Sequence, residues 1–135
     1  MHHINSNEST ELEEDTSWGY LDSVEVGRLA TAHDTQPSIF PVNFVVDGSS
    51  VVFRTAEGTK LAEMVLNQHV AFEADDWDHT AGWSVLVRGT AERITDPDEL
   101  ARADKMPLRP WTGTVKHHYV RITPTTITGR YYRFE

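Results

Sequence analysis

The chain contains no cysteine among its 135 residues. It can therefore form no disulfide, and neither a thiolate nucleophile nor a cysteine metal ligand is available. No apolar run approaches the length needed to cross a bilayer, and no charged-then-apolar signal peptide opens the chain. These absences lead us to expect a cytoplasmic protein that does not associate with membranes.

Basic side chains are also scarce. Lys and Arg together number 12 against 21 Asp and Glu, which gives a formal net charge of −9. A protein that binds DNA or RNA through phosphates needs a basic surface, so this balance argues against a nucleic-acid partner. Any anionic ligand would have to be held by a local basic cluster.

Several catalytic and metal-binding signatures are missing. The nucleophile-elbow G-x-S-x-G, the zinc-binding H-E-x-x-H and the Rossmann glycine fingerprint do not occur. The acidic stretch 75–79 does not continue as a calcium-binding loop, because Ala81 and Val87 stand where Gly and Glu are required. His117 and His118 are adjacent on a predicted strand and point to opposite faces, so we predict no metal site.

The remaining pattern is mainly β. Runs rich in β-branched and aromatic residues alternate with turn signals, as in a barrel or sandwich, and two or three short helices interrupt them. Residues 1–15 are polar and acidic and are predicted to be disordered, and residues 16–135 are predicted to form one domain. The predicted strands are 26–32, 39–46, 51–55, 68–74, 83–94 and 117–128, and the predicted helices lie within 10–23, from 59, and from 96 to about 105.

The stretch 51–61 carries the clearest functional signal. A strand ends at Arg54 and Thr55, a glycine turn follows, and an amphipathic helix begins with Thr59 as its predicted N-cap. Helix N-termini attract anions, and Arg54 with Lys60 could add charge-assisted hydrogen bonds to a phosphate. The alternative is an exposed junction whose basic residues are merely solvated.

Three local features refine this picture. Pro41 cannot donate to a strand ladder and is expected at an edge, a bulge or a strand end. Gly89 inside a long strand predicts a bulge or bend. Phe40, Trp83 and Trp111 lie beside predicted strands or loops and could either pack in the core or stack on a planar ligand.

In their order and spacing, six motifs resemble the pyridoxamine 5′-phosphate oxidase-like flavin-binding split barrels. The resemblance is closest to the branch that contains the nitroimidazole-resistance-type reductases, and it extends from about residue 27 to 130. The motifs are Gly27–Thr31, Phe40–Phe44, Phe53–Thr55 with Gly58–Leu61, Val70–Glu73, Gly82–Ala91 and Ile127–Arg130.

The resemblance implies a homodimer of six-stranded antiparallel split β-barrels, Greek-key-like, with FMN in a cleft at the dimer interface. The residues matching the phosphate-binding element are Arg54, Thr55 and Lys60. Those matching the strand along the isoalloxazine ring are Pro41, Val42, Asn43 and Phe44. Those matching a neighbouring strand that borders the cofactor are Trp83, Ser84 and Val85.

The implied activity is an oxidoreductase that transfers hydride or electrons through the flavin to a small organic substrate. Because the cofactor carries this chemistry, we name no catalytic side chain. The loop at 106–113, with Trp111, is a candidate wall or lid over the substrate. The alternatives are a deazaflavin F-420-dependent reductase, a non-catalytic flavin- or haem-binding module with His69, His117 or His118 as axial ligand, and a barrel that has lost its ligand.

Overall fold

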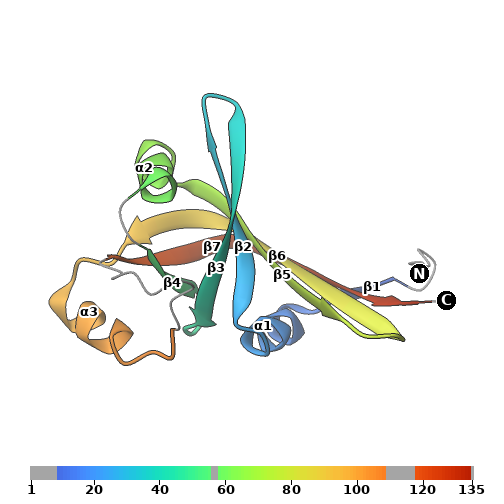
Figure 1. The fold of residues 1–135 in the computed structure, drawn as a ribbon. Helices are drawn as coiled ribbons and strands as arrows, with labels where there is room; N and C mark the ends of the chain where they lie inside the picture. Colours follow the sequence, from blue (N-terminus) through green and yellow to red (C-terminus); the bar gives the residue numbers. More distant parts are fainter. Residues whose placement is uncertain (1–8, 56–57, 109–117, 135) are drawn as a thin grey trace.

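The computed structural model describes residues 9–55, 58–108 and 118–134, with the side chains of residues 59 and 65 excepted. Within these ranges the chain forms mainly β-strands with three short helices (Figure 1). In chain order the elements are β1 (Thr10–Leu12), α1 (Glu14–Asp22), β2 (Val26–His33), β3 (Gln36–Val46), β4 (Val51–Thr55), α2 (Thr59–Leu66), β5 (His69–Trp77), β6 (Ala81–Arg93), α3 (Pro97–Ala103) and β7 (His118–Arg133).

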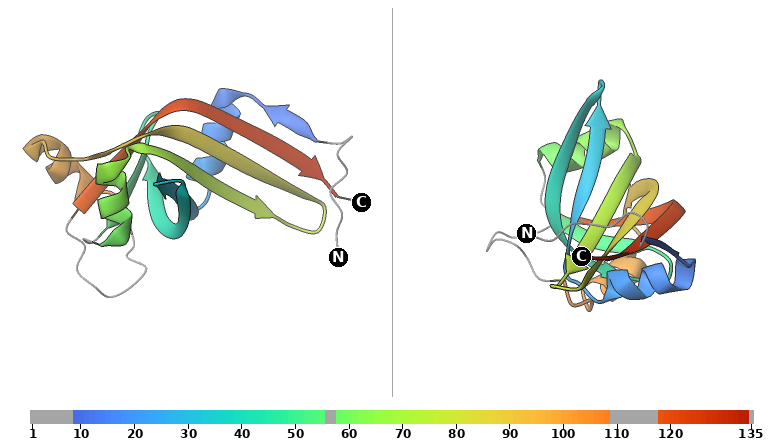
Figure 2. Two further views of the ribbon diagram at one scale, coloured as in Figure 1. Left: turned by 90° about the horizontal axis from the view of Figure 1, so that it is seen from above. Right: turned by 90° about the vertical axis from the view of Figure 1, so that its right-hand side faces the viewer.

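Six antiparallel strands close into a ring. The pairing runs β7–β4–β3–β2–β5–β6, and β6 pairs back onto β7, while β1 adds to the far end of β7. The predicted six-stranded antiparallel fold is thereby confirmed. The ring is open on one side, because β3 and β4 pair only over residues 44–46 and 51–53. On the opposite side β5, β6 and β7 continue beyond the ring as a three-stranded arm (Figures 1 and 2).

Alternation along the strands separates an inner from an outer face. In β4, Val51 and Phe53 are fully buried in the core enclosed by the ring. Val52 points the other way and is buried in a second cluster, which includes Ala103 of α3 and Tyr119 of β7. The short β4 is therefore covered on both faces, which explains its uninterrupted apolar run.

Turn chemistry determines the connections around β3. Gly48 has a φ of 60°, and Asp47 and Ser50 exchange backbone hydrogen bonds of 2.9 and 3.1 Å, so the predicted Asp47–Gly48 hairpin is confirmed. The β2–β3 turn places Asp34 and Thr35 at φ values of 49° and 64°. Two such residues produce the mirror-image turn that fits the strand twist, although neither is glycine.

The predicted irregularity at Gly89 is also confirmed. The register between β6 and β7 shifts between Arg88 and Gly89. A Cβ atom at position 89 would lie 2.2 Å from the carbonyl oxygen of Thr123, so only glycine fits. Because a bulge bends its strand, it lies where β6 and β7 pass from the arm into the ring.

Two local predictions need correction. Ordered structure begins before residue 16, because β1 pairs with β7 and α1 starts at Glu14. The N-cap of α2 is Gly58 rather than Thr59. The predicted start of α3 is confirmed, since the Asp96 carboxylate accepts the Glu99 backbone N–H at 3.0 Å and Pro97 opens the helix. In the described part of the chain, no helix combines the length and apolarity that would cross a membrane.

Candidate functional site

Arg54 is the central residue of the junction between β4 and α2. By strand alternation it points outward, opposite to its buried neighbours Phe53 and Thr55. It lies beside its register partner Tyr119, with the guanidinium carbon 5.5 Å from the ring centroid. This stacking covers one side of the guanidinium and leaves its edge for other partners.

The Nε atom of Arg54 is buried and has no hydrogen-bond partner among residues 9–55, 58–108 and 118–134. Buried donors in folded proteins almost always have a partner, and an arginine donor left without one costs more than a neutral donor does. An anion at the edge of this guanidinium would supply the missing acceptor. The residue therefore fits the predicted role of a phosphate ligand.

Lys60 lies in the first turn of α2, at the open side of the ring. Its Nζ is 5.8 Å from the ring centroids of both Phe40 and Phe53. Phe53 belongs to the inner face and Arg54 to the outer one, so the two basic residues approach the opening beside β4 from different faces. Phe40 is half-buried and packs against the core, which agrees with the prediction that it is a packing residue.

Glu63 fixes the orientation of α2. Its carboxylate accepts hydrogen bonds from the hydroxyl groups of Thr31 and Ser38, the latter at 3.2 Å. The Asn67 side chain, just after the helix, donates to the carbonyl of Ala32 at 3.0 Å. The helix is thus fastened to the β2–β3 hairpin, and its N-terminus is held beside the end of β4.

The four predicted residues of β3 divide between the two faces. Val42 and Phe44 are buried in the core, where the Phe44 ring meets that of Phe72 at a centroid distance of 4.7 Å. Their side chains therefore cannot line a surface site, and a ligand along β3 would meet only their backbone. Pro41 is exposed and Asn43 half-buried on the outer face, in the segment where β3 pairs with β2 alone. Pro41 thus lies at a strand edge, as predicted from its inability to donate a backbone hydrogen bond.

The predicted residues of β6 divide in the same way. Val85 is fully buried, and Trp83 faces inward, where its ring stacks on that of Tyr20 at 5.0 Å. Ser84 lies on the outer face, opposite Arg130 of β7. Of this segment, therefore, only Ser84 presents its side chain on the face that Arg54 and Pro41 share.

One chain does not bring the predicted residues into a single site. The β4–α2 junction lies at one end of the molecule, whereas Trp83, Ser84 and Val85 belong to the arm at the other end, as both ribbon figures show (Figures 1 and 2). Trp111, the predicted wall or lid, lies outside the described residues.

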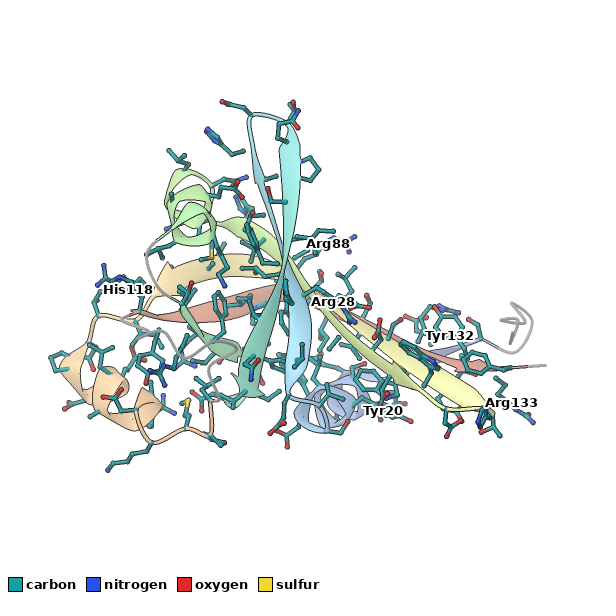
Figure 3. All side chains as sticks on the ribbon, viewed as in Figure 1. Tyr20, Arg28, Arg88, His118, Tyr132 and Arg133 are labelled. Carbon is teal, nitrogen blue, oxygen red and sulfur yellow. The ribbon has the colours of Figure 1, made fainter. Side chains whose placement is uncertain are left out.

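The outer face carries one charged cluster that the sequence did not indicate as a site. The Arg28 Nη1 atom contacts the Glu73 carboxylate at 2.9 Å and that of Asp75 at 3.1 Å. Burial raises the pKa of Glu73 to about 7, and the hydrogen bond and charge of Asp75 add to this more than Arg28 counteracts. Arg28 is register partner of both Pro41 and Glu73, so the cluster borders the predicted flavin strand (Figure 3). The sequence signal that could have indicated this cluster is a basic residue on one predicted strand and two acidic residues, two positions apart, on another.

No group of three or more His, Asp or Glu residues is arranged to hold a metal ion in the parts of the chain that the structure describes.

Comparisons with known proteins agree with this architecture. A solved structure of the FAD binding protein from Mycobacterium smegmatis is 48% identical, with a TM-score of 0.82 over 93% of this chain and 99% of that one. A Corynebacterium glutamicum protein named "putative pyridoxamine 5′-phosphate oxidase" is 42% identical, with a TM-score of 0.83 over 95% and 96%. Protein Rv3129 of Mycobacterium tuberculosis is 48% identical over 90 residues, which cover 67% of this chain and 82% of that protein.

The sequence profile of the family described as pyridoxamine 5′-phosphate oxidase matches residues 13–131. This span includes β2 to β6 in full, β7 as far as Tyr131, and every described residue of the candidate site. The chain belongs to the pyridoxamine 5′-phosphate oxidase family.

Proposed function

We propose that this protein is a flavin-dependent oxidoreductase that binds FMN at the interface of a homodimer. The observation that carries the proposal is the buried, unpartnered Nε of Arg54 at the end of β4. Family membership supports a flavin as the ligand, as does the similarity to a protein named for binding FAD.

Arg54 holds the flavin phosphate, and Lys60 adds positive charge from the first turn of α2. The positive end of the α2 helix dipole also attracts an anion at this junction. The N-cap of α2 is Gly58, so no side chain caps its first turn. With a net charge of −9, the protein depends on this local cluster for anion binding.

The isoalloxazine ring lies along the outer edge of β3, against Pro41, Asn43 and the backbone of Val42 and Phe44. When bound, the flavin supplies the hydride and electron transfer. The protein's own contribution is to bind and orient the ring and to exclude water from one side of it. The exposed Pro41 fits this role, because a ring can approach a strand edge that has no competing N–H donor.

A second copy completes the site. In its own chain β6, which carries Ser84, is separated from β3 by β2 and β5, so the arm segment borders the flavin of the partner instead. Ile39 on the outer face of β3 is 71% exposed, and Val26 on β2 is 37% exposed. Apolar side chains on an uncovered sheet face are typical of surfaces that associate.

The first test is a fluorescence titration of cofactor-free protein with FMN, FAD and riboflavin. For wild type we expect one FMN per protomer at a micromolar Kd or tighter, and weaker binding of riboflavin, which lacks the phosphate. Arg54→Ala and Lys60→Ala should each weaken FMN binding by about 10- to 150-fold, as for loss of a charged hydrogen bond. Riboflavin affinity should change little.

Lys105→Ala is the matched control, because it removes one positive charge from an exposed position after α3. Equal FMN affinity in wild type and Arg54→Ala would refute the phosphate assignment. Binding of a deazaflavin or haem without FMN would instead favour those cofactors, and preference for FAD would assign the dinucleotide form.

The dimer is tested separately by sedimentation. Ile39→Glu introduces a charge on the proposed contact face and should shift the protein to monomers and weaken FMN binding together. A monomeric variant that keeps full FMN affinity would show that one chain suffices.

A further inference from the structure

A cavity of about 270 Å³ lies on the arm, away from Arg54. Its walls come from α1, from both strands of the β5–β6 hairpin and from β7. The residues that carry the inference are Tyr20, Trp83, Tyr131, Asp76 and Asp78. By strand alternation Asp76, Trp83 and Tyr131 are neighbours on the inner face, whereas Ser84 of the proposed flavin site is on the outer face.

Aromatic residues form one wall of this cavity. Tyr20 stacks on the buried Trp83 with an interplanar angle of 30°, and Tyr131 is the register partner of Trp83 on the adjacent strand. The side chains of Tyr20 and Tyr131 are half-buried, so both keep surface that a ligand can contact. Trp77, which is 67% exposed, is the register partner of Gly82 and points to the outer face by strand alternation, so its ring is not part of this wall.

Two carboxylates complete the cavity. Asp78 Oδ1 accepts three hydrogen bonds, from the Thr80 backbone N–H at 2.7 Å, the Thr80 hydroxyl at 2.9 Å and the Ala81 backbone N–H at 3.0 Å. These bonds lower the pKa of Asp78 and keep it charged at neutral pH. Asp76 Oδ1 accepts the backbone N–H of Trp77 at 2.9 Å. Both carboxylates retain a second oxygen to direct at a ligand.

No arginine, lysine or histidine is among the described residues that line the cavity. The lining itself is therefore negatively charged, with His79 of the adjacent turn acting on Asp78, and a phosphate or carboxylate ligand is disfavoured there. Aromatic faces attract cations through the ring quadrupole, and such cages recognise alkylammonium groups. We propose that this cavity binds a small organic ammonium ion, held against the half-buried rings of Tyr20 and Tyr131 by the carboxylates of Asp76 and Asp78.

The test compares choline with 3,3-dimethylbutan-1-ol, a neutral molecule of the same shape, by titration of the purified protein with and without FMN. We expect saturable binding of choline, at least about tenfold weaker binding of the neutral isostere, and upfield shifts of the choline methyl protons from the aromatic walls. Asp76→Asn and Asp78→Asn should each weaken choline binding by about three- to tenfold. Asp34→Asn removes the same charge from an exposed turn and should leave binding unchanged.

Three results would overturn the inference. Equal binding of the two isosteres would show an apolar pocket that does not recognise charge. Failure of choline to bind the folded wild-type protein would show that the cavity takes no such cation. Displacement of choline by riboflavin would assign the cavity to the flavin ring instead. The FMN affinity of Arg54→Ala decides the flavin proposal separately, because that variant leaves this cavity intact.

Discussion

Two charged clusters of this molecule use the same residue types in opposite proportions. In the cluster beside the β3–β4 turn, one carboxylate, that of Asp47, is shared by two arginines. Arg121 contacts it at 2.8 Å, and one Arg102 nitrogen contacts both its oxygens at 2.9 Å. In the cluster on the outer face of β2 and β5, the single Arg28 is shared by Glu73 and Asp75.

The ratio of arginines to carboxylates in each cluster decides whether the pKa of its carboxylate is lowered or raised. Burial alone would raise the pKa of Asp47, but hydrogen bonds and charge from Arg121 and Arg102 lower it below its ordinary value. Burial likewise raises the pKa of Glu73, and there Asp75 reinforces the effect and outweighs Arg28. One cluster thus stabilises the ionised carboxylate, whereas the other favours protonated Glu73 near neutral pH.

Burial separates the two clusters as well. The Arg121 side chain is 18% exposed and also donates to Ser50 at 2.6 Å, whereas the Arg28 side chain is 45% exposed. The first cluster fastens α3 and β7 to the β3–β4 turn. The second lies on the open face that we assign to the dimer, where a partner or ligand would change its surroundings.

The largest effect should come from Asp47→Asn. Removing the carboxylate that both arginines contact leaves Arg121 largely buried beside Arg102 without this counter-charge. We expect the free energy of unfolding to fall by about 2 kcal/mol at pH 7, less than for a fully buried pair. Urea denaturation measures this, with Asp34→Asn at an exposed turn as the control. A loss no larger than in the control would show that the cluster does not fasten α3.

Arg28→Met should have a smaller effect that depends on pH. It keeps much of the side chain's length but removes the one cation between Glu73 and Asp75. At pH 8, where Glu73 is mostly charged, we expect a loss of about 0.5 to 1 kcal/mol, within the range of exposed pairs. At pH 5 the loss should shrink, because Glu73 is then protonated. Equal losses at the two pH values would contradict the raised pKa of Glu73.

Glu73→Gln should remove a pH dependence of the wild type. Because the folded pKa of Glu73 is raised to about 7, the folded protein binds this proton more tightly than the unfolded chain does. Its contribution is therefore greatest below the unfolded pKa of about 4.3 and is lost as pH rises to about 7. The variant should lose this downward slope, a difference of roughly 0.5 kcal/mol across the window. Parallel pH profiles would place the pKa of Glu73 near its ordinary value.

The smallest effect should come from salt. Between about 0.05 and 0.5 M NaCl the loss caused by Arg28→Met at pH 8 should fall by a few tenths of a kcal/mol, since exposed charges are screened. The loss caused by Asp47→Asn should change less, because Arg121 is mostly shielded from solvent. An equal salt response in both variants would remove the distinction between the clusters.

Local signals predicted a large part of this fold. The Asp47–Gly48 turn, the Asp96–Pro97 helix start and the Gly89 bulge each depend on the conformational range of one or two residues, so they could be read directly. The order of the motifs was sufficient to indicate the family. The structured start at β1 was missed because its three residues are held by pairing with β7, more than a hundred positions away.

The candidate site was only partly predictable. Arg54 was identified from its neighbours in the sequence, but its unpartnered Nε depends on packing against Tyr119 of a distant strand. Val42, Phe44 and Val85 were placed near a ligand by family likeness, whereas their side chains fill the core. A motif match specifies positions along the chain and not the face to which each side chain points.

The sequence by itself determined where strands and turns occur, the chain's family and the scarcity of basic groups, because these follow from short-range periodicity, turn chemistry and composition. Only the tertiary structure decided that β6 pairs with β7 and closes the ring. It also decided that Asp47 contacts two arginines, whereas Arg28 contacts two carboxylates. The cavity lined by aromatic residues of α1, β6 and β7 likewise exists only in the folded chain. Each of these depends on pairing register between distant segments, and a shift of one residue would exchange the two faces of a strand.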